Sequence, residues 1–282
     1  MESLEDFVND DELAIAPLAV RGVEVELVPW RRSTDWRRFE GVVIRSTSDF
    51  PLDPEAFFAC LTRIEGAGTP LANPLEVARW NLHKSYLFDL ERRGVPVVPT
   101  RRVVGLDAER LLALFDELDA SEIVLKPAVG ANAERTFRVR REPAEGSDEV
   151  LSALGQVETL AQPFVESVLT RGELSLFWIG GACSHAIRKR PAPGDFRVQE
   201  EHGGEITAIA AEEPLLTAAK RAIAAVPGEL LYARVDLVEL EHGDWRVMEL
   251  ELIEPSLYLR MAPEAPARLA EAVVRWLPVS TP

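Results

Sequence analysis

Apolar and polar positions alternate along the first hundred residues in short runs that predict strands and helices in turn. Residues 22–28 (GVEVELV) alternate with the period of a β-strand, and residues 41–44 (GVVI) form a short apolar run typical of a buried strand. Apolar residues recur at helical spacing in 54–65, and residues 75–90 also predict a helix. Strands that alternate with helices are typical of a parallel α/β sheet, in which ligands meet the carboxyl ends of the strands.

The residues that follow the GVVI run are candidates for contact with a substrate. Arg45, Ser46 and Thr47 stand directly at the carboxyl end of this expected strand, although an ordinary loop has the same position. The chain begins with acidic and polar residues and a helix-like segment, 13–20, where a module of this kind usually opens with a buried strand. We therefore expect either that a first strand is missing from this sequence or that the module is reduced.

A lysine stands at the end of a later expected strand. Residues 107–118 predict an amphipathic helix, and residues 122–126 (EIVLK) predict a strand that ends at Lys126, before a loop of small residues, 128–133 (AVGANA). An exposed strand-end lysine beside such a loop can bind a phosphate whose oxygens accept hydrogen bonds from the loop N–H groups. The loop has only one glycine and lacks the P-loop pattern, so an ordinary turn stays an alternative.

Basic residues gather on the next pair of expected strands, in a protein that is otherwise strongly acidic. Residues 172–181 predict a strand that ends in Gly-Gly, and residues 183–190 predict its return. The basic residues of this region are Arg188, Lys189, Arg190 and Arg197. They suit an anionic ligand, or they guard an exposed edge strand. Gly203 and Gly204 predict either a close approach of the backbone to a ligand or a simple turn.

The stretch 232–253 (YARVDLVELEHGDWRVMELELI) predicts a β-hairpin that turns at its His-Gly pair. With the turn centred there, Asp236 lies opposite Glu249 and Arg234 lies opposite Glu251, all on one face of the hairpin. The other face is predicted to be core and holds Val235, Leu237, Met248, Leu250 and Leu252.

Carboxylates that face each other at about 5 Å across two strands repel one another unless a cation neutralises them. Oxygen ligands supplied by Asp236, Glu249 and Glu251 suit Mg²⁺. We therefore predict a metal site on this face of the hairpin, and we expect the acids to repel one another when no metal is bound. The alternative is a solvated acidic face in which Arg234 neutralises Glu251.

The composition narrows the classes of partner. The chain has 282 residues, of which 47% are hydrophobic, and a formal net charge of −16, which argues against nucleic-acid and anionic membrane surfaces. Its two cysteines are too few for a disulfide framework or a zinc site. The sequence shows no signal peptide and no apolar run of transmembrane length. We expect a cytoplasmic protein with small-molecule partners, and a homo-oligomer if the N-terminal module is reduced.

Several motifs follow one another in an order typical of one superfamily. They are Ile44 to Thr47, Asn73-Pro74, Lys84, Val124 to Pro127, Gln162 to Val165, Gly172-Glu173, Arg188 to Pro191, Gly194 to Arg197, Ala233 to Asp236, and Glu249 to Glu251. In this order they resemble the ATP-grasp superfamily, over about residues 23–277 and most closely the branch of prokaryotic glutathione synthetase and the O-ureido-serine cyclo-ligase of cycloserine biosynthesis. The resemblance implies an α/β and α+β fold. Its expected parts are an N-terminal pre-ATP-grasp α/β module (1–100), a small lid-like subdomain (101–165) and a C-terminal subdomain with the metal site (166–282).

The resemblance also implies a role for each matching residue. For ATP it implies Lys84 and Lys126 at the phosphates, Gln162, Phe164 and Val165 at the hinge that reads adenine, and Glu173 at the ribose. For two Mg²⁺ ions it implies Asp236, Glu249 and Glu251; for catalysis it implies Arg188 or Lys189, with Arg197 and Arg234; and for the substrate it implies Arg45, Ser46, Thr47, Gly203 and Gly204. Many ATP-grasp proteins have Asn where Glu251 stands, and the phosphate loop here is poor in glycine.

The implied activity is that of an ATP-dependent carboxylate–amine ligase. A carboxylate attacks the γ-phosphate of ATP, and an amine then displaces phosphate from the acyl-phosphate to form an amide, with a small amino-acid-like molecule as the expected substrate. Positioning and charge neutralisation supply most of the catalysis in such phosphoryl transfers. Two alternatives stay open: an ATP-grasp kinase or other phosphotransferase, and a non-catalytic module that only binds nucleotide.

Overall fold

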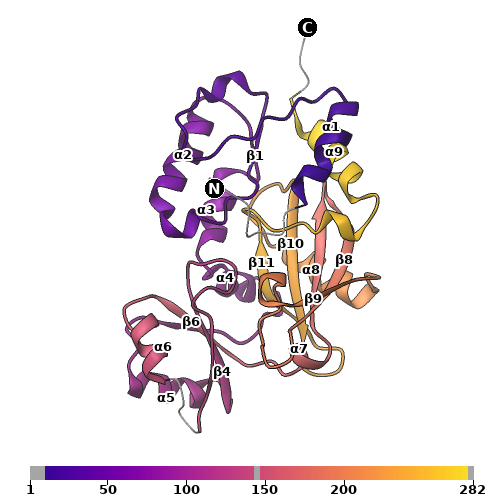
Figure 1. The fold of residues 1–282 in the computed structure, drawn as a ribbon. Helices are drawn as coiled ribbons and strands as arrows, with labels where there is room; N and C mark the ends of the chain where they lie inside the picture. Colours follow the sequence, from indigo (N-terminus) through magenta and orange to yellow (C-terminus); the bar gives the residue numbers. More distant parts are fainter. Residues whose placement is uncertain (1–9, 143–146, 279–282) are drawn as a thin grey trace.

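The computed structural model describes residues 10–142 and 147–278, and in these ranges its strands form a two-stranded, a four-stranded and a five-stranded sheet (Figure 1). Residues 1–9, the acidic start of the predicted N-terminal module, lie outside the described residues. No helix within the described ranges is both long and apolar enough to cross a lipid bilayer. The domain boundaries expected near residues 100 and 165 stay predictions.

The N-terminal module carries a small sheet and three helices. Its elements are β1 (Val42–Val43), α2 (Pro54–Gly66), β2 (Leu71–Ala72), α3 (Leu75–Leu82) and α4 (Tyr86–Arg92). β1 and β2 pair in parallel, as the alternation of strands and helices predicts. Asp53 caps the start of α2, since its carboxylate accepts a hydrogen bond from the N–H of Ala56, and the buried residues of α2 have helical spacing. The preceding helix, α1 (Ile15–Val20), packs on α9 (Ala265–Trp276), which comes from the other end of the chain (Figure 1).

The strand predicted for residues 22–28 is wrong, because these residues have no regular secondary structure. Their apolar side chains do not share one buried face. Val23 packs with the cluster around α9 and Val28 with the cluster around α2, whereas Val25 and Leu27 are exposed. An alternating pattern therefore arises here from two separate packing contacts and not from a sheet.

The helix predicted over residues 75–90 is divided into α3 and α4 by a short break. His83 has an extended backbone conformation, with φ −96° and ψ 120°. The N–H of Lys84 then donates to the carbonyl oxygen of Ala128 at 2.7 Å. The break thus joins the N-terminal module to the loop after β4 and fixes the backbone of Lys84.

The four-stranded sheet is antiparallel, in the order β3-β6-β4-β5. Its elements are β3 (Arg101–Val103), α5 (Ala108–Glu117), β4 (Glu122–Pro127), β5 (Phe137–Arg140), α6 (Ser147–Leu154) and β6 (Thr159–Pro163). The predicted helix over 107–118 and the predicted strand over 122–126 are confirmed. A buried cluster that includes Leu114, Phe115, Ile123 and Leu125 joins α5 to the sheet.

The five-stranded sheet is also antiparallel, in the order β11-β10-β7-β8-β9. Its strands are β7 (Glu173–Ile179), β8 (Ala182–Arg190), β9 (Glu205–Ile209), β10 (Tyr232–Glu239) and β11 (Trp245–Glu251), and its helices are α7 (Ser167–Thr170), α8 (Glu213–Ala224) and α9. Leu174 and Leu176 of β7 pack in the cluster of α8, whereas Phe177 and Ile179 pack in the cluster of α9. Since side chains alternate along a strand, α8 and α9 cover opposite faces.

The predicted hairpin register is confirmed at the acidic residues, where Asp236 pairs with Glu249 and Arg234 pairs with Glu251. Beyond Asp236 the register shifts by one residue, so that Leu237 pairs with Val247. The extra residue of this β-bulge is Met248. Its predicted place in the core is therefore wrong: Val247 is buried there instead, and Met248 lies on the same side as Glu249.

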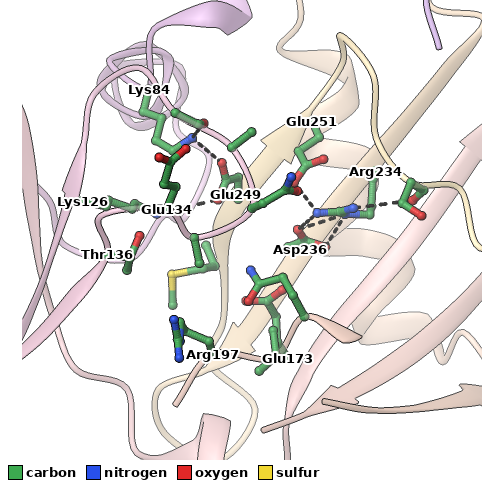
Figure 2. A pocket seen from close by; sticks show the side chains of 18 of the residues that line it. Lys84, Lys126, Glu134, Thr136, Glu173, Arg197, Arg234, Asp236, Glu249 and Glu251 are labelled. Carbon is green, nitrogen blue, oxygen red and sulfur yellow. Dashed lines mark hydrogen bonds and ion pairs between the residues drawn. The ribbon is translucent and has the colours of Figure 1, made fainter. Parts of the chain in front are cut away.

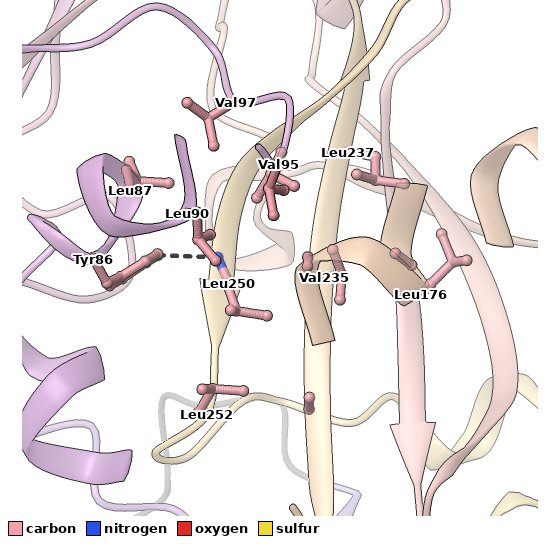
Figure 3. Packing of buried hydrophobic residues seen from close by; sticks show 14 of the residues in the cluster. Tyr86, Leu87, Leu90, Val95, Val97, Leu176, Val235, Leu237, Leu250 and Leu252 are labelled. Carbon is pink, nitrogen blue, oxygen red and sulfur yellow. Dashed lines mark hydrogen bonds between the residues drawn. The ribbon is translucent and has the colours of Figure 1, made fainter. Parts of the chain in front are cut away.

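The outer edge of β11 is satisfied by the N-terminal module and not by another strand. Leu250 N–H donates to the hydroxyl of Tyr86 at 2.9 Å, and Leu252 N–H donates to the amide oxygen of Asn81 at 2.8 Å. Asn73 donates to the carbonyl of Leu252 at 2.7 Å. Figure 3 shows Tyr86, Leu87 and Leu90 of α4 beside β11 at this edge. The module is thereby held against the strand that carries two of the predicted metal ligands.

Candidate active site

A pocket lies where the four-stranded and five-stranded sheets meet the loop that follows β1. Most of the predicted site residues line it: Arg45, Ser46, Lys84, Lys126, Gln162, Phe164, Val165, Glu173, Lys189, Arg197, Arg234, Asp236, Glu249 and Glu251. Thr47, Arg188, Gly203 and Gly204 are not among the lining residues. The structure therefore brings together motifs that are spread over more than two hundred residues of sequence.

The predicted residues outside the lining have other surroundings. Arg188 precedes Lys189 on β8, and because side chains alternate along a strand it points away from the pocket. Gly203 has a left-handed backbone, with φ +79°, and ends a short turn. A Cβ on Gly204 would lie 2.2 Å from the carbonyl oxygen of Val198. The two glycines thus permit a tight turn, which was the simpler of the two predicted alternatives.

Two buried lysines converge on one carboxylate at what we call the lysine end of the pocket (Lys84, Lys126 and Glu249; Figure 2). Lys84 Nζ lies 2.7 Å from Glu249 Oε1, and Lys126 Nζ lies 3.8 Å from Glu249 Oε2. Burial lowers the pKa of Lys126, against the charge of Glu249. Lys126 is only 7% exposed, so the expectation of an exposed strand-end lysine is wrong.

The loop after β4 also lines the lysine end, as the sequence predicts. Gly130 accepts a hydrogen bond from Lys84 Nζ at 2.8 Å, and residues 130–134 border the pocket. Asn132 and Ala133 both have positive φ, 53° and 54°, without being glycine. The left-handed conformation costs such residues roughly 1 kcal/mol each. This loop therefore adopts, at some cost, a backbone conformation that usually requires glycine.

The predicted metal ligands are neutralised by basic side chains. Asp236 accepts hydrogen bonds from Ser175 Oγ at 2.5 Å and from Arg234 at 3.0 Å, and it lies 3.3 Å from Lys189 Nζ. Glu251 forms an ion pair with Arg234, which is the alternative that the sequence left open. Within the described residues no group of three or more acidic, histidine or cysteine side chains is arranged to hold a metal ion. The donor set consists of carboxylate oxygens on one face, which fits Mg²⁺ chemically.

The pKa of each of these acids depends on its burial and on the basic side chains beside it. Burial opposes the ionisation of Glu249, but the nearby Lys84 and Lys126 more than offset it and hold the pKa of Glu249 at about 2. Burial also opposes the ionisation of Asp236, whose pKa Arg234 and Lys189 hold at about 2. For Glu251 the effect of burial exceeds that of the nearby Arg234, and the pKa of Glu251 is raised to about 7.

Lys189 and Arg197 differ in how they are held. Lys189 is 2% exposed and lies 2.5 Å from Glu173 and 3.3 Å from Asp236. Burial raises the pKa of Glu173, which Lys189 partly opposes. Arg197 is paired with Asp195 at 2.7 Å, and its hydrogen bonds lower the pKa of that acid. Lys189 is thus fixed by two acids of the pocket, whereas Arg197 is neutralised by its own loop.

The predicted hinge lies between the four-stranded and the five-stranded sheet, and part of its backbone is already hydrogen-bonded within the protein. Phe164 N–H donates to the carbonyl of Glu122 at 2.9 Å, and Gln162 donates through its side chain to Thr100 Oγ1 at 3.0 Å. The ring of Phe164 lies 3.6 Å below the guanidinium of Arg138 and meets Phe196 edge-on at 6.3 Å. Apolar walls therefore lie beside the hinge, and a flat ring suits such a space.

A second group of lining residues forms what we call the arginine end of the pocket (Asp11, Arg45, Ser46, Glu254 and Ser256). Arg45 lies 2.8 Å from Asp11, and the hydroxyl of Ser46 donates to Asp11 at 2.9 Å. Burial, with the charge of Glu251, raises the pKa of Glu254 to about 8.

Sequence reasoning identified Arg45 and Ser46 but missed Asp11, Glu254 and Met248. Asp11 and Glu254 come from near the two ends of the chain, and neither belongs to an alternating or helical pattern. Two consecutive apolar residues, Val247 and Met248, interrupt the alternation of the hairpin, and this change of phase was the local signal for the bulge. The EPS sequence at 254–256, directly after the acidic strand, was the one local signal for Glu254.

Comparison with known proteins places these features in one family. Residues 1–73 match the family described as D-cycloserine synthetase DcsG, N-terminal domain. The chain is 34% identical over 273 residues to the cycloserine biosynthesis protein DcsG of Streptomyces lavendulae, which covers 91% of this chain and 90% of that protein. The crystal structure of D-cycloserine synthetase DcsG superposes with a TM-score of 0.82 at 32% identity, covering 95% of this chain and 94% of that one.

A more distant structure shares the fold. The ATP-grasp ligase PsnB, solved with a minimal precursor, Mg and ADP, has a TM-score of 0.65 at 20% identity and covers 94% of this chain and 92% of its own. The ATP-grasp fold predicted from the order of the motifs is confirmed by these likenesses.

Proposed function

The chain belongs to the ATP-grasp ligases, and from this membership we propose that its lysine end binds the phosphates of ATP while its arginine end binds a small amino-acid substrate. The protein is an ATP-dependent ligase that forms a carbon–nitrogen bond. The observation that carries the proposal is the convergence of Lys84 and Lys126 on Glu249, next to the acidic face of the hairpin.

At the lysine end, two buried ammonium groups share one carboxylate. Burial and the neighbouring Lys84 both disfavour the charge on Lys126. An anion with several oxygens would stabilise the two ammonium charges better than Glu249 alone, because each lysine could then donate to its own acceptor. We propose that ATP phosphates take over the lysines and leave Glu249 available for a metal ion.

Asp236, Glu249 and Glu251 would then hold Mg²⁺, and two ions are expected. When bound, Mg²⁺ neutralises charge that develops on the phosphates. Arg234 would keep its place, since it bonds both Asp236 and Glu251 and is fixed from two strands. Gln162, Phe164, Val165 and Met248 would border adenine, and Glu173 would bind the ribose in place of part of its contact with Lys189.

The chemistry takes place between the two ends. A substrate carboxylate oxygen attacks the γ-phosphorus, the bond to ADP breaks, and an acyl-phosphate forms. A nitrogen then attacks the acyl carbon, phosphate leaves, and the nitrogen loses a proton to solvent. Arg234 contacts Asp236 and Glu251, and Lys189 contacts Asp236, so their N–H groups can stabilise negative oxygen in both steps.

The amine is proposed to belong to the same molecule as the carboxylate. The relative that covers most of this chain is named for cycloserine biosynthesis, and its family-specific N-terminal domain is present here. An O-ureidoserine-like amino acid, whose own nitrogen closes a ring, is therefore the first substrate to test.

The test measures ADP release with ATP, Mg²⁺ and single compounds from a panel of free amino acids that includes O-ureidoserine, with mass spectrometry of the products. The proposal expects ADP only with an amino acid and an amide as product. A phosphorylated acid that accumulates would identify a kinase. ADP release at the same rate without any amino acid would contradict the proposed ligase reaction.

A further inference from the structure

One acid of the arginine end differs from the other acids of the pocket. Each of the other partly buried acids in the lining has a basic partner: Asp11 with Arg45, Glu173 with Lys189, Asp236 with Arg234, Glu249 with Lys84, and Glu251 with Arg234. Glu254 forms no hydrogen bond and no ion pair with the residues that the structure describes. A half-buried carboxylate without a partner is costly unless a ligand completes it.

The backbone around Glu254 is held in place by four side chains. Tyr232 donates through its hydroxyl to the carbonyl of Ile253 at 2.8 Å, and Arg45 donates to the carbonyl of Pro255. Arg234 reaches the carbonyl of Ser256 at 3.5 Å, and His185 Nε2 lies 3.0 Å from the carbonyl of Leu257. The residues on both sides of Glu254 are therefore fixed, while its own carboxylate stays available. A group held in this way binds a ligand without first being ordered.

Arg45 offers a second unused group beside it. Its Nε and Nη2 atoms bond Asp11 and Pro255, but its buried Nη1 has no hydrogen-bond partner among the described residues. Arg45 contacts the backbone of Pro255, the residue after Glu254, and both Arg45 and Glu254 line the pocket. The arginine end therefore presents an acceptor and a donor side by side, and a ligand that fits both carries an N–H cation and an oxygen acceptor.

We propose that Glu254 binds the α-ammonium group of the substrate, which restricts the enzyme to free amino acids and excludes N-acylated and peptide-linked ones. This inference rests on the proposed function. An ammonium group supplies up to three N–H donors and one charge. A divalent ion is a poorer fit, because the guanidinium of Arg45 would repel two charges and no third acidic ligand completes a site within the described residues.

The experiment compares three forms of one compound on the wild-type protein: O-ureidoserine, its N-acetyl derivative and its analogue without the amino group. Binding is measured by the shift of the melting temperature in the presence of Mg²⁺ and a non-hydrolysable ATP analogue. We expect the free amino form to bind about tenfold to a hundredfold more tightly than the other two, the range for a charged hydrogen bond. Serine and alanine, each with the same two modifications, extend the panel.

Variants then assign the preference to Glu254. Glu254→Gln should bind the free amino form about tenfold to a hundredfold more weakly and lose the preference for it, while its stabilisation by the ATP analogue stays that of the wild type. Glu254→Asp should keep part of the preference. Glu201→Gln is the matched control, because it removes one charge from an exposed acid of the same pocket, and its preference should not change.

Two kinds of result would overturn the inference. One is a Glu254→Gln protein that still prefers the free amino form, or one that changes only its Mg²⁺ dependence. The other is a wild-type protein that binds every amino compound and its modified forms equally, or binds none of them; this result needs no variant and so does not depend on how Glu254→Gln folds. The proposed nucleotide site fails separately, if the ATP analogue does not stabilise the wild-type protein.

Discussion

The two ends of the pocket are built from different kinds of structure. The lysine end stands on regular strands, with Lys126 on β4 and Glu249 on β11. The arginine end is built from segments without long strands, which include Asp11, Arg45 and Glu254 and come from three distant parts of the sequence. Ladders of backbone hydrogen bonds fix the first end, whereas side chains that bond carbonyl groups fix the second.

The two ends also differ in charge. Glu249 at the lysine end is paired with Lys84 and Lys126, whereas Glu254 at the arginine end has no ion pair within the described part of the chain. Removing Glu249 from its ion pairs couples stability to catalysis, because two buried lysines are then left without their acid. An unpaired group affects mainly the choice of ligand. Substitutions at the two ends should therefore have different consequences.

Glu249→Gln should have the largest effect, because it removes the acid that Lys84 and Lys126 share. The change removes a metal ligand, so ADP release should fall by roughly a thousandfold or more. It also leaves Lys84 and Lys126 without their acid, so the metal-free protein should lose roughly 3 kcal/mol of unfolding free energy. The measurements are ADP release and melting curves in EDTA and in Mg²⁺-ATP.

This outcome reverses what the acidic hairpin alone suggests. From opposed carboxylates one expects less repulsion, and hence no loss of stability, in Glu249→Gln. The structure shows the acids already neutralised by Lys84, Lys126 and Arg234. A metal-free Glu249→Gln protein that melts at or above the wild-type temperature would contradict the ion pairs described here.

Lys126→Met should have the next largest effect and separates affinity from stability at the same end. The substitution removes a charged phosphate contact, so ATP should bind about tenfold to a hundredfold more weakly. The side chain is similar in size, and burial already disfavours the charge on Lys126, so the melting temperature should hardly change. Titration with ATP and Mg²⁺ measures the affinity, and unchanged affinity in a folded protein would remove Lys126 from the phosphate site.

The smallest effect is expected from pH and concerns the arginine end. Burial lowers the pKa of His185 to about 4, and its Nε2 supports the carbonyl of Leu257 beyond Glu254. Between pH 6.5 and 4 the unfolded chain binds more protons at this site than the folded protein, so stability falls as pH falls through that window. We expect a contribution on the order of 1 kcal/mol, allowing for partial exposure of the ring.

His185→Phe should flatten this part of the pH profile, because the ring still stacks on Phe177 at a similar distance but cannot be protonated. His242→Asn is the control, since His242 is almost fully exposed in the hairpin turn. Melting temperatures are measured from pH 7 to 4 for all three proteins. A profile for His185→Phe with the same slope as the wild type would exclude His185 as the source.

The lysine end could be predicted from the sequence to a larger extent than the arginine end. The strands β4, β7, β8, β10 and β11, and the facing of Asp236 and Glu249, follow from the sequence, because period and pairing are local properties of strands. The bulge at Met248 coincides with two consecutive apolar residues, Val247 and Met248, where the alternation changes phase, but the segment of Val97 and Val98 that contacts β11 there is distant in the sequence. The false strand at 22–28 has the same cause: its apolar residues serve two different packing contacts.

The arginine end was predictable only in part. Arg45 and Ser46 follow a buried strand, which gives a local reason to consider them. Asp11 and Glu254 join them through contacts that cross the whole chain, as in the bond from Arg45 to Pro255. Such contacts between loops have no periodic signature in the sequence.

The most direct test of the account follows one oxygen atom from the arginine end to the lysine end. O-ureidoserine, or whichever amino acid of the panel supports ADP release, is labelled with ¹⁸O in its carboxylate and turned over with ATP and Mg²⁺. An acyl-phosphate intermediate predicts one ¹⁸O atom in the inorganic phosphate formed with each amide. Inorganic phosphate without the label, in a reaction that still yields the amide, would contradict it.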